Sequence, residues 1–285
     1  MSLQVDHLSF SYGSHVVLDD ISFEVPDGML VNVLGHNGVG KSTLFRCILG
    51  LEDSWTGSIT INGKDARSLS IAEYAREMAY IPQTHSSVYA YEVIDVVLMS
   101  TTAGLKALAK PGHRQLEFAY ECLDRVGIAD LADRPYTNIS GGEQQLVLIA
   151  RALAQRAQTI IMDEPTSALD YGNQVRVLSQ IKHLAGEGYT IIESTHYPDQ
   201  AFLFSDRTLV LNDGTILCYG DPKDTITDKV INEVYGVRVS VESLYNDQVR
   251  VCVPIDEIEI GGHRGNHCDG DESHHDFQRQ VRRKN

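Results

Sequence analysis

The glycine-rich stretch Gly35–Thr43 constrains the fold of this chain more than any other segment. It reads G-H-N-G-V-G-K-S-T and fits the pattern G-x-x-x-x-G-K-[ST]. An apolar, β-branched run at 29–34 precedes it, and apolar residues at helical spacing follow it. The expected order is therefore buried strand, glycine loop and helix, which is the context this pattern requires. In that order, backbone N–H groups and a helix N-terminus surround a phosphate. The sequence predicts a nucleotide-binding α/β domain.

Individual roles within the loop follow from its chemistry. The Lys41 ammonium is expected to reach the β- and γ-phosphates of the nucleotide, and the Ser42 hydroxyl to ligate Mg²⁺. The alternative is an ordinary glycine-rich turn, which the flanking strand and helix argue against. The predicted loop contacts are Gly35, His36, Asn37, Gly38, Val39, Gly40, Lys41, Ser42 and Thr43.

Composition excludes several classes of protein. The net charge is −15, from 24 basic and 39 acidic residues, which opposes nucleic-acid binding because that needs a basic face. Five scattered cysteines without a C-x-x-C pair indicate a reducing compartment and no disulfide framework. We expect no secretory signal and no bilayer-spanning helix, since no apolar run approaches about 18 residues. The expectation is a soluble, cytoplasmic chain whose membrane role, if any, comes through a partner.

The pattern of elements changes twice along the chain. Strands are predicted in the N-terminal part, helices in the middle, and alternating strands and helices from 159 onward, which indicates a sheet with a parallel core and helices on its faces. The predicted strands are 3–10, 22–25, 29–34, 58–61, 78–81, 159–162, 190–194 and 208–211. The predicted helices are a segment starting near Lys41 and the segments 71–76, 92–99, 114–126, 142–154 and 173–184.

A second chemical signal follows the predicted strand 159–162. Asp163 and Glu164 come directly after it, which places both carboxylates at the carboxyl end of the sheet, where ligands of open α/β sheets bind. Asp163 suits the Mg²⁺ shell, and Glu164 can orient and deprotonate an attacking water. A strand that ends in solvated acids is the alternative, and the position of the pair after the glycine loop argues against it.

A third motif, Ile139–Gln144, reads I-S-G-G-E-Q. With the glycine loop and the acidic pair, it makes the chain resemble the ATP-binding cassette (ABC) ATPases over about residues 1–235. The resemblance implies that adenine stacks on Tyr12, that Gln83 touches Mg²⁺ and water, and that His196 lies near the γ-phosphate. It also implies nucleotide contacts from the signature residues Ser140, Gly141, Gly142 and Glu143, and a loop at 167–170 that crosses a dimer interface.

The resemblance also implies a fold. We expect an α/β P-loop NTPase (RecA-like) core with a mixed, partly parallel sheet, an antiparallel N-terminal β part and a helical subdomain at about 84–154. The metal ligands implied are Ser42, Gln83 and Asp163, and the catalytic residues are Glu164 and His196. Two residues depart from the usual signature: Ile139 replaces Leu, and Glu143 replaces Gln.

The signature motif points to a second subunit. Gly141 and Gly142 let a helix begin with exposed N–H groups close to an anion, and Ser140 adds a hydroxyl donor, yet the chain already has a phosphate loop. In ABC proteins the signature of one subunit covers the nucleotide held by the other, so the resemblance implies a head-to-tail homodimer that sandwiches ATP.

The resemblance favours the ATPase subunit of an importer for iron-siderophore, haem, cobalamin or a related metal compound. Its implied partners are a second copy, membrane permease subunits and, indirectly, a substrate-binding protein, at the cytoplasmic face of the membrane and without nucleic acid. The permease contact is predicted in the loop 84–92, with Tyr89 and Tyr91 as candidate anchors. Two alternatives remain: a soluble ABC protein that acts on another machine, and a non-catalytic nucleotide switch.

The C-terminal part follows no family pattern. Residues 236–260 form a short extension with strand-like alternation, and 261–285 form a histidine-rich tail expected to be disordered. The tail carries possible ligands for Zn²⁺ or a similar ion, but their spacing matches no structural zinc motif. These residues are His263, His267, Cys268, His274 and His275.

Overall fold

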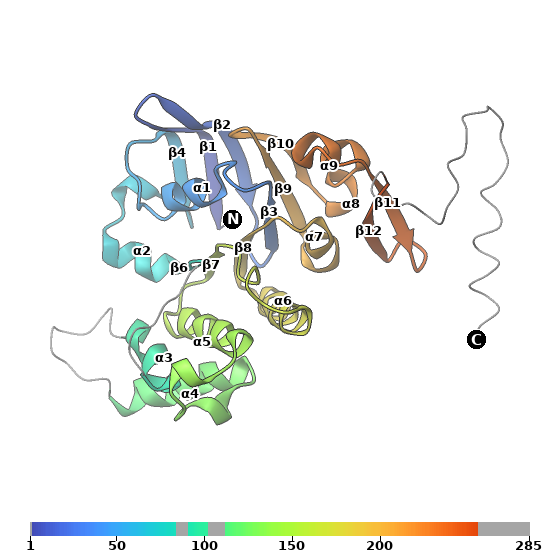
Figure 1. Ribbon diagram of the computed structural model, residues 1–285. Coiled ribbons are helices and arrows are strands. Elements are labelled where there is room, and N and C mark those ends of the chain that lie inside the picture. Colours follow the sequence, from blue (N-terminus) through green and yellow to red (C-terminus); the bar gives the residue numbers. More distant parts are fainter. Residues whose placement is uncertain (1, 84–90, 102–111, 256–285) are drawn as a thin grey trace, which may run out of the picture.

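The computed structural model describes residues 2–83, 91–101 and 112–255 (Figure 1). Two larger sheets, a two-stranded hairpin and the helices around them build this part of the chain. The larger sheet has six strands in the order β10-β9-β3-β8-β7-β6. Its strands are β3 (Leu30–Leu34), β6 (Met78–Ile81), β7 (Thr159–Met162), β8 (Thr190–Thr195), β9 (Arg207–Asn212) and β10 (Thr215–Gly220).

The central strands of this sheet are parallel, as predicted. Strands β9, β3, β8, β7 and β6 all run in one direction, and only the edge strand β10 is antiparallel. Every residue of β3, β7 and β8 is buried, because helices or the second sheet cover both faces. A strand buried on both sides reads as a continuous apolar run, which is why 29–34 and 159–162 could be predicted.

The N-terminal sheet is antiparallel, with the order β2-β1-β4-β5. It packs, together with α1 (Lys41–Ile48), on one face of the six-stranded sheet through a shared apolar core. Strand β2 is longer than the predicted 22–25, because a register shift near Asp20, whose φ is +55°, interrupts the alternation. The strands are β1 (Leu3–Tyr12), β2 (His15–Val25), β4 (Thr56–Ile61) and β5 (Lys64–Asp65).

The helices of the middle region cover the other face. They share one apolar core with β7 and β8, so the side chains of Ile160, Met162 and Ile191 pack under them. Figure 1 shows α3, α4 and α5 grouped at the lower left, below α2 and β6. The helices on this face are α3 (Val93–Thr101), α4 (His113–Arg125), α5 (Gly141–Ala154) and α6 (Tyr171–Gly186). Helix α2 (Ile71–Glu77) instead packs through Tyr74 against the core of the N-terminal sheet.

The C-terminal part of the described chain packs around a third apolar core. A cluster that includes Leu34, Ala201 and Val239 joins the end of β3 to α7, α9 and the final hairpin. The strand-like alternation predicted for 237–260 is confirmed at 239–254, where β11 pairs with β12, and residues 256–260 lie outside the described part. Helices α7, α8 and α9 and strand β10 were not predicted. These elements are α7 (Pro198–Phe204), α8 (Pro222–Thr225), α9 (Asp228–Tyr235), β11 (Val239–Leu244) and β12 (Val249–Pro254).

The predictions about membrane-spanning helices and disulfides can be compared with the described residues. Among them, no helix is long and apolar enough to cross a membrane. Their four cysteines, Cys47, Cys122, Cys218 and Cys252, are free thiols. Most of the predicted permease loop, with Tyr89, and the histidine-rich tail lie outside the described residues.

Candidate functional site

The glycine loop joins β3 to α1, in the predicted order of strand, loop and helix. Gly40 has a φ of +109°, which a residue with a side chain rarely adopts, and a Cβ there would lie 3.1 Å from both Leu18 Cδ2 and the Val17 carbonyl oxygen. The backbone therefore turns sharply over β2 just before the helix begins. This turn directs the N-terminus of α1 toward the cavity beside the loop.

Lys41 lies inside the loop. Its side chain is buried, and Nζ donates hydrogen bonds to the carbonyl oxygens of Gly35 (2.7 Å) and His36 (3.1 Å). Burial lowers the pKa of Lys41 below its usual value, and the nearby carboxylates Glu164 and Asp163 oppose that shift. The ammonium is therefore partly desolvated, and a point charge of this kind interacts strongly with a phosphate.

The acidic pair lies at the carboxyl end of β7, as the sequence predicted. Ser194 of β8 holds its turn together, because its Oγ donates to Asp163 Oδ1 (2.6 Å) and accepts from the Glu164 backbone N–H (2.9 Å). Glu164 has a φ of +47°, a conformation that few residues other than glycine adopt. The sequence patterns did not identify Ser194, whose role depends on the pairing of β7 with β8.

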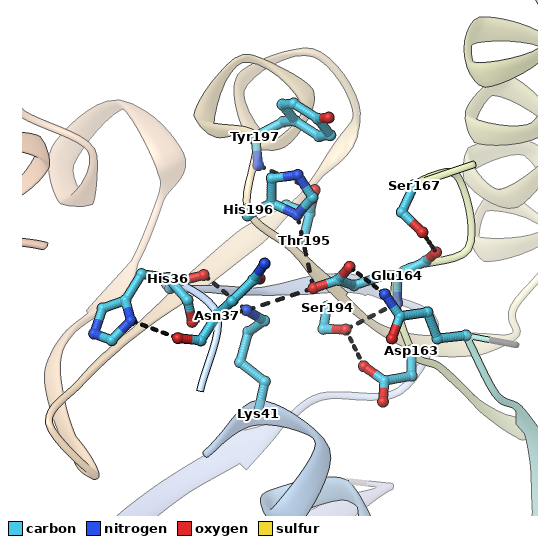
Figure 2. A network of polar contacts seen from close by, with 12 residues as sticks. His36, Asn37, Lys41, Asp163, Glu164, Ser167, Ser194, Thr195, His196 and Tyr197 are labelled. Atoms are coloured by element: carbon cyan, nitrogen blue, oxygen red, sulfur yellow. Dashed lines mark hydrogen bonds and ion pairs between the residues drawn. The ribbon is translucent and has the colours of Figure 1, made fainter. Parts of the chain in front are cut away.

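Glu164 is the centre of the polar network in Figure 2. Its Oε2 accepts a hydrogen bond from Gln83 Nε2 (2.8 Å). Its Oε1 lies 3.7 Å from Lys41 Nζ and 3.7 Å from His196 Nδ1. These are ion-pair distances that exceed normal hydrogen-bond lengths. Four elements thus bring Gln83, Lys41, Glu164 and His196 together, although they are far apart in the sequence.

His196 follows β8 directly and precedes α7. Its ring lies 4.0 Å from the ring of Tyr197, measured between centroids. Its Nδ1 is buried and has no hydrogen-bond partner among the described residues. A buried nitrogen of this kind, close to a carboxylate, suits a contact with a bound group or water.

Two cavities meet at Gln83 and Glu164. The first, of about 260 Å³, is lined by the phosphate loop and α1, and Lys41, Ser42 and Thr43 contribute to it. The second, of about 450 Å³, lies between the start of α5 and the segment 165–169, and Gly141 lines it. The structure therefore brings Gly141 and Gln144 near Glu164, whereas Ser140, Gly142 and Glu143 line neither cavity.

Ser140 and Glu143 cap helix α5 reciprocally. The Ser140 N–H and hydroxyl both donate to Glu143 Oε2, at 2.7 and 2.8 Å, and the Glu143 N–H donates to Ser140 Oγ at 3.3 Å. The hydrogen bond from the Ser140 backbone N–H, and after it the bond from the Ser140 hydroxyl, lower the pKa of the half-buried Glu143 carboxyl. The Ser140 hydroxyl, expected as a phosphate donor, here donates to Glu143.

The remaining predicted contacts lie around this centre. Tyr12, at the end of β1, is 45% exposed, packs edge-on against Phe10 and donates to Glu52 Oε1 (3.0 Å). It lines neither cavity, so the structure does not bring Tyr12 together with the other predicted residues. His36 Nδ1 donates to the Asn37 carbonyl oxygen (2.8 Å).

The predicted Mg²⁺ ligands supply the right donor chemistry. Ser42 and Gln83 line the first cavity, and Asp163 lies at the turn beside it. Because Gln83 donates through Nε2 to Glu164, its amide oxygen is oriented away from that bond. A hydroxyl, an amide oxygen and a carboxylate are hard oxygen donors, which Mg²⁺ prefers. The residues fit the ion.

Comparison with known proteins agrees with this site. The ABC transporter family model matches residues 18–167. An ABC transporter ATP-binding protein of Haemophilus influenzae is 40% identical over 245 residues, which cover 86% of this chain and 92% of that protein. The molybdate import ATP-binding protein MolC of the same organism is 34% identical, over 82% of this chain and 88% of that protein.

Solved structures agree as well. A transporter described as metal-chelate type, in an inward-facing conformation, is 32% identical and superposes with a TM-score of 0.80. The match covers 90% of this chain and 98% of that one. The fold predicted from the sequence, an α/β ABC ATPase with a mixed sheet, is therefore confirmed.

Proposed function

The chain belongs to the ATP-binding family of ABC transporters, an ATPase family, and on that premise we propose that it hydrolyses ATP as the homodimeric motor of a membrane importer. The observation that carries the proposal is the extent of the match. Relatives named for molybdate and iron chelatin transport align over 82–87% of this chain and 88–97% of their own length. Other relatives are named for hemin and cobalamin import. The proposed cargo is an iron-siderophore, haem, cobalamin or a related metal compound.

The proposed chemistry uses the network around Glu164. Ser42, Gln83 and Asp163 would hold Mg²⁺, which neutralises phosphate charge when bound. Lys41 binds the β- and γ-phosphates, and Gln83 orients the Glu164 carboxylate. The oxygen of the attacking water bonds to the γ-phosphorus, and Glu164 accepts a proton from that water. The bond between the γ-phosphorus and the β–γ bridging oxygen breaks, which gives ADP and phosphate. His196, 3.7 Å from the same carboxylate, is proposed to contact the γ-phosphate.

The second copy is proposed to complete each site. Residues 140–143 of one subunit would cover the nucleotide in the phosphate loop of the other, with Tyr12 against the adenine and residues 167–170 at the interface. Lys41 lines the first cavity, whereas Ser140 lines neither cavity. This supports the proposal that the signature contacts the nucleotide bound by the other subunit. The proposed ATPase domain is 1–235, with the helical subdomain at 84–154.

Reconstitution tests the importer proposal. The chain is purified with each candidate permease pair in lipid vesicles, and ATP turnover and cargo uptake are measured for ferric siderophore, haem, cobalamin and molybdate. We expect one permease to bind the chain and one cargo to stimulate turnover. A chain that hydrolyses ATP but associates with no permease would instead support the alternative, a soluble ABC ATPase with a non-transport partner.

The contact with the permease has its own test. Tyr91, the described aromatic of the proposed coupling loop, is 43% exposed, and its carbonyl oxygen accepts from the Tyr136 N–H (2.8 Å). Aromatic side chains are frequent interface hot spots. Tyr91→Ala should reduce uptake more than basal ATP turnover, while Tyr245→Ala, an exposed tyrosine in the final hairpin, serves as the matched control. Equal loss of both activities would contradict the assignment.

A further inference from the structure

A row of buried polar side chains crosses the middle of the six-stranded sheet. Glu193 of β8 and Thr208 of β9 are the register partners of Asn32 on the two sides of β3. All three are buried, and Glu193 is only 1% exposed. Side chains alternate along a strand, so the row lies on the same face as Leu30 and Ile191, whose core extends to α6. The mechanism proposed above uses none of these residues.

The hydrogen bonds of this row are incomplete. Asn32 Nδ2 donates to Glu193 Oε1 (3.1 Å). The Thr208 hydroxyl is buried without a hydrogen-bond partner among the described residues, and so are the remaining oxygens of the pair, Asn32 Oδ1 and Glu193 Oε2. Both are acceptors if Glu193 is ionised, so each would be left unsatisfied, and the carboxylate charge would be buried with one hydrogen bond.

A single proton satisfies both atoms. We infer that Glu193 is protonated near neutral pH and that its Oε2–H donates to Asn32 Oδ1. Together with the bond from Asn32 Nδ2, this closes a ring of two hydrogen bonds between an acid and an amide. The buried pair is then neutral, and each of its four polar atoms has a partner.

Within the part of the chain that the structure describes, burial and one hydrogen bond determine the pKa of Glu193. Burial raises the pKa of Glu193 to about 7, and only the hydrogen bond from Asn32 opposes it. The charged groups on the covering helices and adjacent strands have other partners. Lys182 of α6 pairs with Asp206, His183 pairs with Glu187, Arg176 faces the Gly127 carbonyl, Asp199 of α7 accepts from the Cys252 N–H, and Arg207 of β9 lies over the Tyr219 ring.

Asn32 and Glu193 precede, along their strands, the segments that form the proposed catalytic site. Strand β3 ends two residues after Asn32 and continues into the phosphate loop. Strand β8 continues from Glu193 into Ser194, which holds the turn of Asp163 and Glu164, and then into His196. The acid–amide ring therefore joins β3, which leads into the phosphate loop, to β8, which leads into His196. Glu193 acts as a positioning residue, and loss of its proton breaks one of the two bonds.

The variant Glu193→Gln isolates this effect. A glutamine amide can accept from Asn32 Nδ2 and donate to Asn32 Oδ1, so it reproduces the protonated acid but cannot titrate. ATP turnover of the full chain is measured from pH 5.5 to 9 for the wild type, for Glu193→Gln and for Glu121→Gln, an exposed control on α4. Titrations elsewhere in the chain affect all three alike, so the ratio of wild-type turnover to Glu193→Gln turnover reports Glu193.

We expect this ratio to be near one at low pH and to fall about fivefold through neutral pH, the size of one hydrogen bond. Glu121→Gln should show no such fall. A constant ratio across the range would overturn the proposal. The experiment needs only ATP hydrolysis, so its result does not depend on the importer role.

Infrared spectroscopy tests the proton without relying on activity. The wild-type chain should show a carboxylic-acid carbonyl band that disappears as pH rises through neutrality and that Glu193→Gln lacks. An ionised Glu193 at low pH, with no such titrating band in the wild type, would overturn the inference even if the variant fails to fold.

Discussion

Single residues carry the chemistry of this site, and Lys41 is the clearest case. Its ammonium is the only cation that lines the phosphate cavity within the described residues. Lys41→Ala should weaken ATP binding at least tenfold, since hydrogen bonds to charged groups contribute about 1.5–3 kcal/mol. Isothermal titration with ATP measures the loss, and Lys223→Ala, a remote lysine, is the control. Unchanged affinity in a folded variant would show that this loop does not hold the phosphates.

Glu164 has a different role, which affects turnover and not binding. Glu164→Gln keeps the size of the side chain and can still accept from Gln83, but it removes the proton acceptor. We expect ATP affinity close to the wild-type value and turnover reduced by about 10²–10⁴-fold, the usual contribution of a general base. Phosphate release under single-turnover conditions measures the step. A variant that keeps more than a tenth of the activity would exclude Glu164 as the base.

Glu193 gives stability a pH dependence of known sign. Its pKa is about 7 in the folded chain, above the ordinary carboxyl value of 4.5, so the folded state binds the proton more tightly than the unfolded state. The wild-type free energy of unfolding should therefore fall relative to Glu193→Gln as pH rises through this window, by on the order of 2–3 kcal/mol. Urea unfolding of both chains at several pH values checks the trend. If the free energy of unfolding of the wild type rose relative to that of Glu193→Gln as pH rises, the result would contradict it.

The sequence indicated these residues unequally. Lys41, Asp163 and Glu164 belong to motifs with a physical meaning at fixed spacing, so the amino-acid sequence alone identifies them. Ser194 and Glu193 could not be identified in this way, because a polar residue within a strand gains its role only from the neighbouring strand. Their partners Asp163 and Asn32 are 31 and 161 positions away, and only the sheet order brings them together.

At the scale of elements, α5 and α6 begin in the same way. A capping side chain, Ser140 or Asp170, accepts from the N–H three residues later. A glutamine in the next position then donates to two carbonyl oxygens of the preceding loop: Gln144 to those of Tyr136 and Ile139, and Gln174 to those of Thr166 and Leu169. Both loops are thus fixed to their helices by hydrogen bonds. The starts of the two helices also lie close together, because a Cβ on Gly142 of α5 would lie 2.4 Å from Asn173 Oδ1 of α6.

This construction separates the structural role of the signature from its proposed catalytic role. Ser140→Ala should lower the free energy of unfolding by about 1 kcal/mol, the usual cost of losing an N-cap. Because Ser140 lines no cavity with its own phosphate loop, ATP affinity of the separated subunit should stay unchanged while turnover of the dimer falls. Thr227→Ala, which removes the cap of α9, is the matched control for stability. Weaker ATP binding by the separated subunit would place the signature at its own nucleotide.

The sequence predicted the boundaries of elements that bury many apolar side chains, and it did not predict elements that bury few. Strand β7 and helix α5 lie within a residue of their predicted limits, because apolar periodicity alone defines them. Helix α7 was missed, since it has seven residues, begins at Pro198 and buries only Ala201 completely. Helix α7 nevertheless contacts the site, because Gln200 Oε1 accepts a hydrogen bond from the Thr195 hydroxyl (2.9 Å) directly before His196.

At the scale of the whole molecule, three apolar cores place the polar network. The sheet separates two of them, and the third joins the end of β3 to α7 and the C-terminal hairpin. The order of the strands, β3 between β9 and β8, was not predicted, because sequence patterns do not specify which parallel strands are neighbours. That order brings the phosphate loop, the acidic turn and the histidine to one edge.

The last prediction concerns the dimer and follows from the arrangement of both cavities. One subunit holds Lys41 at the first cavity, while Ser140 lies outside it, so ATP should bridge two copies across their signature and phosphate loops. Glu164→Gln with ATP and Mg²⁺ should therefore form a stable dimer, because the nucleotide that holds the interface is not consumed. Light scattering after size exclusion gives the mass, with ADP as the first control. The double variant Lys41→Ala/Glu164→Gln is the second control and should stay monomeric, since it cannot bind the bridging phosphates. A Glu164→Gln chain that remains monomeric at saturating ATP would contradict the sandwich, whereas a dimer that forms equally with ADP would show that the interface does not depend on the γ-phosphate.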